Sequence, residues 1–573
     1  MKKLLQYMKP FKREFILGPF FKLIEAVLEL FIPIVMAKII DTGIYNKDIT
    51  YIFKMGGVLL LLGAVGLAFA LVCQYYASLA SQGIGTNLRD SLFKHINSLS
   101  HRELDTIGTP TLITRLTNDI NLVQSGFAML IRLGTRSPFI IIGSTIMALS
   151  LDFHLSIIFI ITIPLIVLVI GTIMKKSIPM YKRIQKSLDN ISLITRENVE
   201  GIRVVKAFSK EKSEINRFNE GNEDFVNKNI KVLKISSLLN PLTSIIMNMA
   251  IVLLLHFGGI KVNSGSLTQG EIIALINYIT QIMLSLIVLS QLIVTLTKGY
   301  TSFNRVMDIM DIPSTIKEEV NIKTLPKEEV KPIIEFKNLS FSYDDSTEYA
   351  LKNINLIINK NDNIGIIGGT GSGKSTLINL IPRFYDPSKG EVIIKGVNVK
   401  EASIKEIRNI IGIVPQKSVL FTGTIKDNLE WGNKNLTDNE IKKALDISMA
   451  SEFVNSLENG IDSKILKNGK NLSGGQKQRL TIARALVKSP EILILDDSLS
   501  ALDFATDAKL RKALKEEVHN ATIITISQRA SSIKNSDKII VMDNGEIKGI
   551  GTHNSLLKDC EIYREICDSQ NCL

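Results

Sequence analysis

Six long apolar segments occupy the first half of the chain, and each is long enough to cross a lipid bilayer as a helix. They lie near residues 16–40, 55–80, 130–151, 155–174, 238–260 and 272–297. The second and fourth carry no charge, whereas the first contains Lys22, Glu25 and Glu29 and the third starts near Arg132 and Arg136. The pattern predicts a six-helix transmembrane bundle, in which the ends of the first and third helices are the least sharply defined.

The distribution of basic residues predicts the orientation of this bundle. Residues 175–234, between the fourth and fifth segments, contain fourteen Lys and Arg, whereas three short loops on the opposite side contain only Lys47 and Lys261. Basic loops stay on the cytoplasmic side, so both termini are expected inside the cell and the chain in the plasma (inner) membrane. The long inside loops have helical patterns, which predicts that the spans continue as helices beyond the lipid.

Several polar residues within these segments allow more than one interpretation. Glu25 and Glu29 share one helical face, so they could attract a cationic substrate, or they could line a water-filled cavity or pair with Lys22. Polar side chains in the last segment are equally ambiguous, because such groups often only bond neighbouring helices. These are Asn277, Gln281 and Gln291.

The formal net charge of +12 is compatible with nucleic acid or with a membrane surface as a partner, and the apolar segments favour the membrane. We therefore expect membrane lipid, and no nucleic acid, around this chain. The N-terminal MKKLLQYMKPFKRE is too charged for a cleavable signal peptide and predicts a basic amphipathic helix on the inner membrane surface. The four cysteines show neither metal-site spacing nor a secreted disulfide framework, which favours a reducing environment.

The character of the sequence changes after residue 310. Residues 311–332 are polar, contain three prolines and lack an apolar period, so they predict a linker between a transmembrane domain, 1–310, and a second domain, 333–573. In the second domain, short β-rich runs such as NIGIIG, EILILDD and ATIITIS alternate with helical stretches. This alternation predicts an α/β domain with a largely parallel central sheet.

The most specific motif is GGTGSGKST, which follows the predicted strand NIGII and opens a helical stretch. Its spacing fits the phosphate loop of nucleotide-binding proteins, in which glycines let backbone amides approach the phosphates. Lys374 would neutralise the β- and γ-phosphates, and the Ser375 hydroxyl would ligate Mg²⁺. The candidate phosphate-binding residues are Gly368, Gly369, Thr370, Gly371, Ser372, Gly373, Lys374, Ser375 and Thr376.

Two further motifs follow in order, LSGGQ at 472–476 and EILILDD at 491–497. Together with the phosphate loop and the six apolar segments, they resemble the ATP-binding cassette (ABC) exporters in their half-transporter form. The resemblance covers nearly the full chain. It implies an ATP-dependent transporter that works as a dimer, with ATP and Mg²⁺ as cofactors and a small molecule as substrate.

The resemblance assigns roles to matching positions. It implies that Tyr343 stacks on adenine, that Gln416 contacts Mg²⁺ and the attacking water, and that Asp496 holds Mg²⁺. The signature residues Ser473, Gly474, Gly475 and Gln476 would cap the ATP held by the partner cassette, and Asp503 would lie along the dimer interface. By position, residues 109–119 and 198–208 match the two segments that contact the cassettes.

Two positions depart from the family pattern. Asp497 stands where the family has a glutamate that polarises the attacking water, and its carboxylate is withdrawn by about 1.5 Å, one C–C bond. Gln528 stands where the family has a histidine, and an amide cannot supply the charge or proton of imidazole. The pattern predicts a site that binds ATP and hydrolyses it slowly.

The LSGGQ signature is intact, whereas Asp497 and Gln528 replace the two residues that the family uses in hydrolysis. In this combination the chain is similar to the degenerate-site subunit of heterodimeric bacterial multidrug exporters, such as the Thermotoga heterodimeric exporter. The resemblance implies a second, non-identical half-transporter as partner, whose active site this chain's signature completes. Two alternatives stay open: a homodimeric exporter with slow aspartate-based sites, and a non-pumping, ATP-gated regulatory subunit. The transported substrate, multidrug or lipid-like, cannot be read from the fold.

Overall fold

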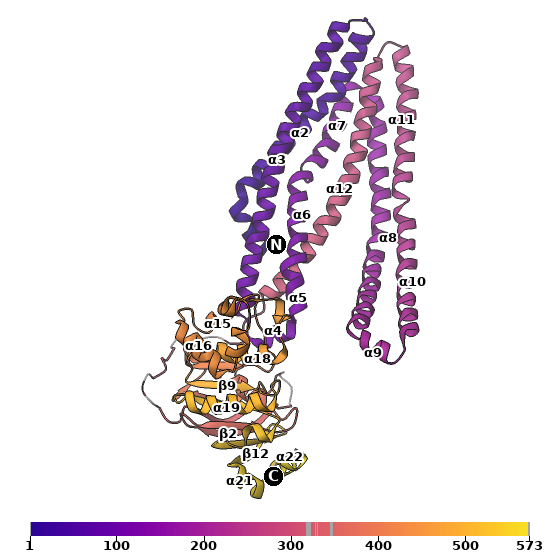
Figure 1. The fold of residues 1–573 in the computed structure, drawn as a ribbon. Helices are drawn as coiled ribbons and strands as arrows, with labels where there is room; N and C mark the ends of the chain where they lie inside the picture. The colour runs from indigo at the N-terminus through magenta and orange to yellow at the C-terminus, as the bar shows by residue number, and fades with distance from the viewer. Residues whose placement is uncertain (1, 317–321, 327, 329, 344–347, 571–573) are drawn as a thin grey trace. The chain divides into compact units, whose positions relative to one another are not determined.

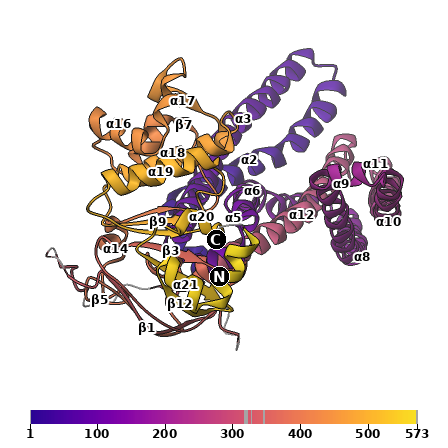
Figure 2. The ribbon, with the colours of Figure 1, turned by 60° about the horizontal axis from the view of Figure 1, so that its bottom comes forward.

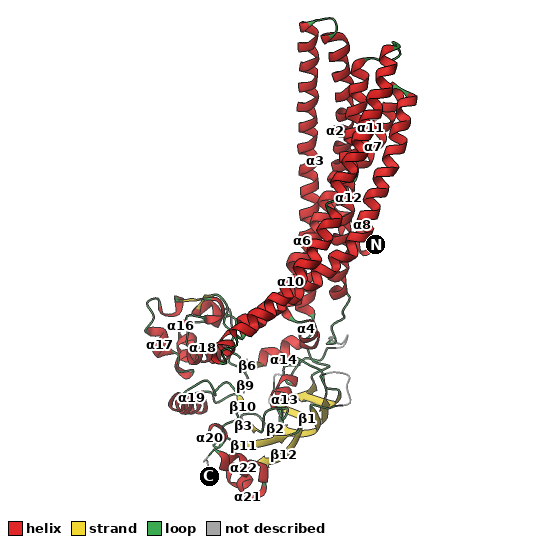
Figure 3. Cartoon of the chain, turned by 90° about the vertical axis from the view of Figure 1, so that its right-hand side faces the viewer, coloured by secondary structure: helices red, strands yellow, loops and turns green. Residues whose placement is uncertain are grey.

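The computed structural model describes residues 2–316, 322–326, 328, 330–343 and 348–570, and the chain divides into two compact units (Figure 1). The transmembrane unit comprises Met1–Asn97 and Thr109–Ile312, and the cassette unit comprises Ser98–Gly108 and Pro313–Leu573. Figure 3 shows that the transmembrane unit is helical and that the strands lie in the cassette unit. The fold is therefore a helical transmembrane region followed by an α/β domain, as the sequence predicts.

The helices of the transmembrane unit follow the predicted apolar segments. Along the chain they are α1 (Lys2–Met8), η1 (Lys9–Phe11), α2 (Lys12–Lys38), η2 (Ile39–Ile44), α3 (Ile49–Ser98), α5 (Thr109–Thr114), η3 (Arg115–Asp119), α6 (Ile120–Leu133), α7 (Arg136–Leu151), α8 (Phe153–Glu200), α9 (Ile202–Ala207), α10 (Glu211–Ser236), α11 (Leu239–Asn263) and α12 (Gln269–Met310). Helices α3, α8 and α12 run well past the predicted spans, so the expected helical extensions are present.

Five helical runs in the described chain are long and apolar enough to cross a membrane. They are Ile49–Ser98, Thr109–Leu151, Phe153–Glu200, Glu211–Asn263 and Gln269–Met310. The first predicted span forms α2, but Lys22, Glu25 and Glu29 lower its apolar content. The third predicted span is not one helix, because α6 ends at Leu133 and α7 begins at Arg136.

The charges of α2 are paired within the bundle. The Lys22 ammonium lies 2.7 Å from both carboxylate oxygens of Glu25, and Arg136 on α7 donates to both oxygens of Glu29 at 2.8 Å. These four side chains are largely buried. Pairing within the protein accounts for both carboxylates, so the arrangement favours the structural interpretation over a substrate role.

Packing within the bundle leaves much of the apolar surface of one long helix exposed. Helix α12 packs against α2, α6 and α7, and α8 packs against α10 and α11 (Figure 1). Helix α3, in contrast, exposes large apolar side chains along its length, among them Leu60, Leu61, Leu67 and Leu71. Such a surface requires lipid or another protein chain as its neighbour.

The cassette unit contains a six-stranded sheet of order β12-β11-β3-β10-β9-β6, parallel except for β12, and a four-stranded antiparallel sheet of order β2-β1-β4-β5. The strands are β1 (Ile334–Phe341), β2 (Leu351–Ile358), β3 (Asn363–Ile367), β4 (Lys389–Ile394), β5 (Val397–Asn398), β6 (Ile411–Val414), β7 (Gly423–Thr424), β8 (Lys464–Ile465), β9 (Ile492–Asp496), β10 (Thr522–Ile526), β11 (Lys538–Asp543) and β12 (Glu546–Gly551). Strands β9 and β10 are buried throughout, as expected for central parallel strands.

The helices of this unit are α4 (His101–Ile107), α13 (Lys374–Leu380), α14 (Ile404–Ile410), α15 (Ile425–Glu430), α16 (Asp438–Ile447), α17 (Ser451–Asn455), α18 (Gly474–Leu486), α19 (Phe504–Glu517), α20 (Ala530–Ile533), α21 (His553–Asp559) and α22 (Glu561–Ser569). One hydrophobic core lies between the two sheets around α13 and α14, and a second lies beneath α15 to α19. Figure 2 shows α16, α17 and α18 gathered on one side of the cassette, with β1 and β5 on the other. The phosphate loop joins a strand and a helix that contribute to the first core, and the signature helix α18 contributes to the second.

The segment 98–108 belongs to the cassette unit, although the sequence predicts the neighbouring segment 109–119 as a cassette contact. The His101 ring stacks on Phe384 with centroids 4.4 Å apart, and the Tyr385 hydroxyl donates to Asp105 Oδ2 at 2.7 Å. Residues 109–119 lie in the transmembrane unit as α5 and η3. The apolar pattern of the neighbouring sequence does not reveal this short polar helix.

The predicted linker, 311–332, lies partly outside the described residues. In its described part, Lys323 pairs with Ala402 as a parallel β-bridge, and the Leu325 amide donates to Glu406 at 2.9 Å. The side chain of Leu325 packs against the first cassette core. This part of the linker is therefore anchored to the cassette surface.

Candidate nucleotide-binding site

The phosphate loop, 368–373, connects the buried strand β3 to α13. A Cβ on Gly368 would lie 2.0 Å from the Met542 carbonyl oxygen, and one on Gly373, which has φ +95°, would lie 2.8 Å from the Leu351 side chain. Both positions therefore require glycine. Gly369, Thr370 and Gly371 are exposed along the outside of the loop. The loop thus holds a tightly wrapped backbone with an accessible outer edge.

Lys374 places its charge inside this loop. Its Nζ donates to the carbonyl oxygens of Gly368 at 2.9 Å and Gly369 at 2.6 Å, and to Ser372 Oγ at 3.3 Å. The side chain is 8% exposed, and burial lowers the pKa of the ammonium while Asp497 and Asp496 raise it. The buried ammonium provides the cation that a phosphate chain requires.

Ser375 and Asp496 meet at the edge of the loop. Ser375, exposed in the first turn of α13, donates from Oγ to Asp496 Oδ1 at 2.9 Å. Asp496 ends the buried strand β9, and burial raises the pKa of its carboxyl while the hydrogen bond from Ser375 opposes that shift. Thr376 is buried behind Ser375.

These oxygens fit a magnesium site that is completed by phosphate. Mg²⁺ takes oxygen ligands and is commonly held by one or two protein groups together with substrate phosphates and water. The described residues contain no cluster of three or more His, Cys, Asp or Glu that could hold a metal alone. Ser375, Asp496 and the loop would hold the cation only together with a nucleotide.

Asp497 follows directly and has a left-handed backbone conformation, with φ +45°. Its amide donates to the Ile526 carbonyl at 3.1 Å, which ties the end of β9 to the end of β10. Gln416, exposed just after β6, donates from Nε2 to Asp497 Oδ2 at 3.4 Å. Burial raises the pKa of the Asp497 carboxyl, whereas Gln416, Lys374 and Arg529 lower it.

Gln528 lies two residues after β10 and is exposed. The loop that carries it is held by Gln570, whose Nε2 donates to the Gln528 carbonyl at 2.7 Å and whose Oε1 accepts from the Ala530 amide at 2.8 Å. Sequence reasoning missed Gln570, because an isolated glutamine beyond the last helix carries no motif. The structure thus brings the loops of Asp497 and Gln528 together through the ends of β9 and β10.

Tyr343 follows strand β1, and its ring is 42% exposed. Its hydroxyl lies 2.9 Å from Thr376 Oγ1 on α13, and its ring meets Phe341 and Tyr385 edge to face at 4.9 and 5.4 Å. The tyrosine is therefore positioned beside the phosphate-loop helix with an open face. Sequence reasoning missed Tyr385, which connects Tyr343 to α4.

The signature begins a helix on the second core. Ser473 caps α18, accepting from the Gln476 amide at 3.2 Å, and Gln476 Oε1 accepts from the Ser473 amide at 2.8 Å. Ser473 and Gly474 are exposed. Among the residues that the structure describes, nothing lies within 4 Å of a Cβ position on Gly474, whereas the Ala501 carbonyl lies 3.6 Å from that of Gly475. The helix presents an open backbone terminus, which favours an anion.

Asp503 caps α19. One of its carboxylate oxygens accepts from the Thr506 amide at 2.9 Å and the other from the Thr506 hydroxyl at 2.7 Å. These two bonds lower the pKa of the carboxyl. The observed role of Asp503 is therefore to begin α19, directly after the segment that packs against Gly475.

Comparison with known protein families and structures gives consistent matches. Residues 15–286 match the family model of the ABC transporter transmembrane region, and residues 351–500 match the family model described as ABC transporter. The chain is 34% identical over its full length to the uncharacterized ABC transporter ATP-binding protein YfiB of Bacillus subtilis, covering 98% of that protein. It is 32% identical to an ATP-dependent lipid A-core flippase of Syntrophus aciditrophicus, over 85% of this chain and 81% of that one.

The fold also matches a solved structure of a bacterial Atm1-family ABC exporter with ATP bound. The TM-score is 0.80 with 24% sequence identity, and the match covers 98% of each chain. The ATPase domain of ABC transporters uses ATP with Mg²⁺. ABC exporters act as dimers in the membrane, with the cassette on the cytoplasmic side. The chain therefore belongs to the ABC transporter family and is an ATP-dependent, multi-pass membrane transporter of the exporter type.

Proposed function

We propose that this chain is one subunit of a heterodimeric exporter, and that its own nucleotide site binds ATP but hydrolyses it slowly. ATP would be held by the phosphate loop, with Tyr343 against the adenine and Ser375, Asp496 and Gln416 around Mg²⁺. Ser473 to Gln476 would complete the active site of a non-identical partner. Productive hydrolysis would then take place mainly at the partner's site.

The observation that carries this proposal is the pair Asp497 and Gln528, which stand where the family has the glutamate and the histidine used in hydrolysis. The Asp497 side chain is one methylene shorter than glutamate, which withdraws its carboxylate by about 1.5 Å. A general base must lie within hydrogen-bond reach of the proton that it removes, and it contributes about 10²–10⁴ in rate. The raised pKa of Asp497 makes its carboxylate a stronger base, but the shorter reach limits where that base acts.

Gln528 is the second residue expected to slow hydrolysis. Gln570 holds the backbone of its loop, and the loop presents an exposed side-chain amide where the family has an imidazole. An amide donates a hydrogen bond but cannot take up or release a proton at neutral pH. Position 528 therefore lacks a group that could shuttle a proton during hydrolysis.

The surface of the chain supports a partner. The capped signature helix α18 is exposed at Ser473 and Gly474. At the turn between α8 and α10, Val199, Val204 and Phe208 are exposed, which suits the proposal that residues 198–208 contact a cassette. Asp497 and Gln528 weaken hydrolysis at this chain's own site. The intact signature is still useful, because it completes the site of a partner that carries the catalytic glutamate and histidine.

For the cargo we propose an amphipathic, lipid-like or multidrug substrate. The similarity to a relative named as a lipid A-core flippase supports the lipid-like class. The paired charges of Glu25 and Glu29 argue against a dedicated binding site for a cation in α2. Lipid transport in proteoliposomes, with and without ATP, tests this assignment.

Two other functions give different results in one experiment. A homodimeric exporter with slow aspartate-based sites predicts transport and ATPase activity by this chain alone. A regulatory, ATP-gated subunit predicts no substrate-stimulated ATPase activity even with the partner. The proposal predicts low activity alone and substrate-stimulated activity with the co-expressed partner, measured as phosphate release in proteoliposomes. Equal activity with and without the partner would contradict it.

A further inference from the structure

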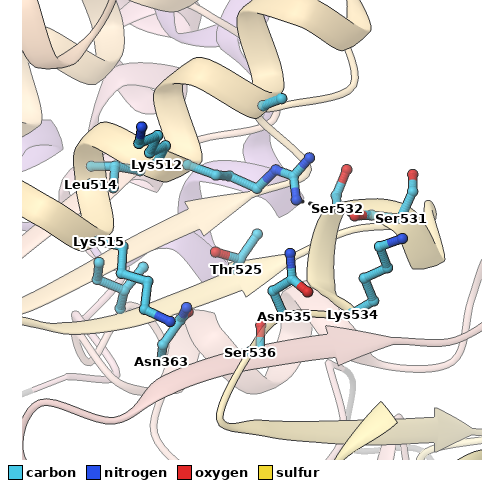
Figure 4. A pocket seen from close by; sticks show the side chains of 13 residues that line it. Asn363, Lys512, Leu514, Lys515, Thr525, Ser531, Ser532, Lys534, Asn535 and Ser536 are labelled. Carbon is cyan, nitrogen blue, oxygen red and sulfur yellow. Dashed lines mark hydrogen bonds between the residues drawn. The ribbon is translucent and has the colours of Figure 1, made fainter. Parts of the chain in front are cut away.

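A second pocket in the cassette unit lies away from the phosphate loop, between α19 and the segment 531–536 (Figure 4). It has a volume of about 650 Å³, within the range of sites for small ligands. Its lining includes the buried residues Leu514, Ile523 and Thr525, which we call its floor, and Figure 4 shows Lys515 and Lys534 on opposite sides of the pocket. The pocket is formed entirely by described residues of one unit.

The lining of this pocket is strongly basic. Arg511, Lys512 and Lys515 come from α19, and Lys534 follows α20. Within the described residues, Lys515 and Lys534 are exposed and have no ion-pair partner, whereas Lys512 lies 3.8 Å from Glu516. Unpaired like charges around one cavity repel one another, and an anionic ligand would relieve that repulsion.

Arg511 is held rigidly at the base of this group. Its Nε and Nη2 contact the two carboxylate oxygens of Asp507 at 3.2 Å, and its Nη1 donates to the Ser531 carbonyl at 3.1 Å. Asp507 is buried and also accepts from Ser532 Oγ at 3.1 Å. A guanidinium has five N–H donors, so two remain for a ligand, and they are pre-oriented.

We propose that this pocket binds a phosphate-bearing small molecule with at least two negative charges. Lys515 and Lys534 would pair with the phosphoryl oxygens, and Arg511, Asn535 and Ser531 supply further polar groups. The apolar floor at Leu514 and Ile523 leaves room for an organic portion. The phosphate could belong to a soluble metabolite or to a lipid headgroup, since both offer the same chemistry.

The pocket adjoins the loop that carries Gln528. Arg511 bonds the carbonyl of Ser531, and Ser532 bonds Asp507, so α19 is already linked to α20. A ligand held by both Lys515 and Lys534 would strengthen that link and restrain the loop. This consequence for the nucleotide site rests on the proposed function, whereas binding itself does not.

The direct test titrates inorganic pyrophosphate, in excess Mg²⁺, into the full-length chain with its nucleotide site saturated by ADP. Calorimetry should show one binding event in the wild-type chain, and Lys515→Glu/Lys534→Glu should weaken it by about tenfold or more. The matched control is Lys442→Glu/Lys443→Glu, which makes the same charge change at exposed positions of α16. The control should stay within about twofold of the wild-type chain, because the change lies outside the pocket.

Equal weakening in both double variants would mean non-specific attraction and would overturn the proposal, as would an absence of binding by the wild-type chain. The source of the phosphate is distinguished in nanodiscs. Pyrophosphate binding that weakens more in phosphatidic acid discs, whose phosphomonoester can carry two charges, than in singly charged phosphatidylglycerol discs identifies a lipid headgroup. Unchanged binding identifies a soluble ligand. These binding measurements do not depend on ATP hydrolysis. The binding proposal can therefore fail while the proposed transport function stands.

Discussion

Gln416 donates from Nε2 to the carboxylate of Asp497 across 3.4 Å, a long hydrogen bond between the loop after β6 and the end of β9. The contact engages Oδ2, while Oδ1 is buried and has no hydrogen-bond partner among the described residues. A carboxylate with one free, desolvated oxygen retains basic character. Its short reach, rather than its basicity, is therefore the property that limits hydrolysis in this account.

Removal of the phosphate-loop ammonium tests the assigned nucleotide site. Lys374→Ala should weaken ATP binding by about 10–100-fold, because a hydrogen bond to a charged group contributes about 1.5–3 kcal/mol. The measurement is equilibrium binding of a fluorescent ATP analogue to the purified chain. Lys442→Ala, an exposed lysine on α16, is the matched control and should bind normally. Comparable binding by both variants would place the nucleotide elsewhere.

The pKa of Asp496 predicts a pH dependence of Mg²⁺-supported ATP binding. Burial raises this pKa above its ordinary value of 3.8, so the carboxylate that would hold Mg²⁺ is lost early as the pH falls. Binding should therefore weaken on acidification at a higher pH than an exposed aspartate would give. Asp496→Asn should bind weakly at neutral pH and show little further change. A wild-type profile that is flat down to the ordinary carboxyl range would contradict this assignment.

Gln570 should control the order of the Gln528 loop. Gln570→Ala removes two hydrogen bonds to the loop backbone, each with a net value of about 0.5–1.5 kcal/mol. Amide hydrogen exchange in residues 528–532 should be faster by about tenfold or more. Ser569→Ala is the control, because within the described residues Ser569 Oγ bonds the Ile566 carbonyl of its own helix and no group of the Gln528 loop. Similar exchange in the two variants would show that other contacts hold the loop.

The hydrogen bond between Tyr385 and Asp105 should anchor α4 to the cassette. Tyr385→Phe removes the donor at a net cost of about 1 kcal/mol, and exchange of the amides in His101–Ile107 should rise by about fivefold. Tyr349→Phe provides a control outside this contact. ATP binding at Tyr343 should be little changed in both, because the Tyr385 ring that packs against it is retained. Unchanged protection of α4 would contradict an anchoring role.

Much of this fold can be predicted from local patterns. The phosphate loop requires a buried strand before it and a helix after it, and NIGII and KSTLINL provide both. The β-rich runs become strands of the parallel sheet because they are apolar throughout and separated by helices. The pairing of strands in the sheets is harder to predict from the sequence. The antiparallel pairing of β1 with β2 and β4 and the joining of β12 to β11 depend on contacts that no periodicity records.

The residues of the candidate site also fall into two groups, those that local motifs predict and those that depend on long-range contacts. Phosphate loop, signature and carboxylates are contiguous motifs, so their residues can be assigned before their geometry is known. Gln570, Arg511 and Tyr385 act through tertiary contacts with distant backbone or side chains, and no spacing rule identifies them. Helix α4 cannot be assigned to the cassette from sequence, because its contacts there involve His101 and Asp105, which lie outside any apolar pattern.

The central claim is that this chain holds ATP and cleaves it slowly because of residues 497 and 528. The direct measurement is single-turnover phosphate release from the assembled transporter, with the partner's own catalytic acid replaced so that only this chain's site contributes. Asp497→Glu/Gln528→His should raise that rate by about 10²-fold or more, within the usual contribution of a general base. A wild-type site that already releases phosphate as fast as the double variant would contradict the account.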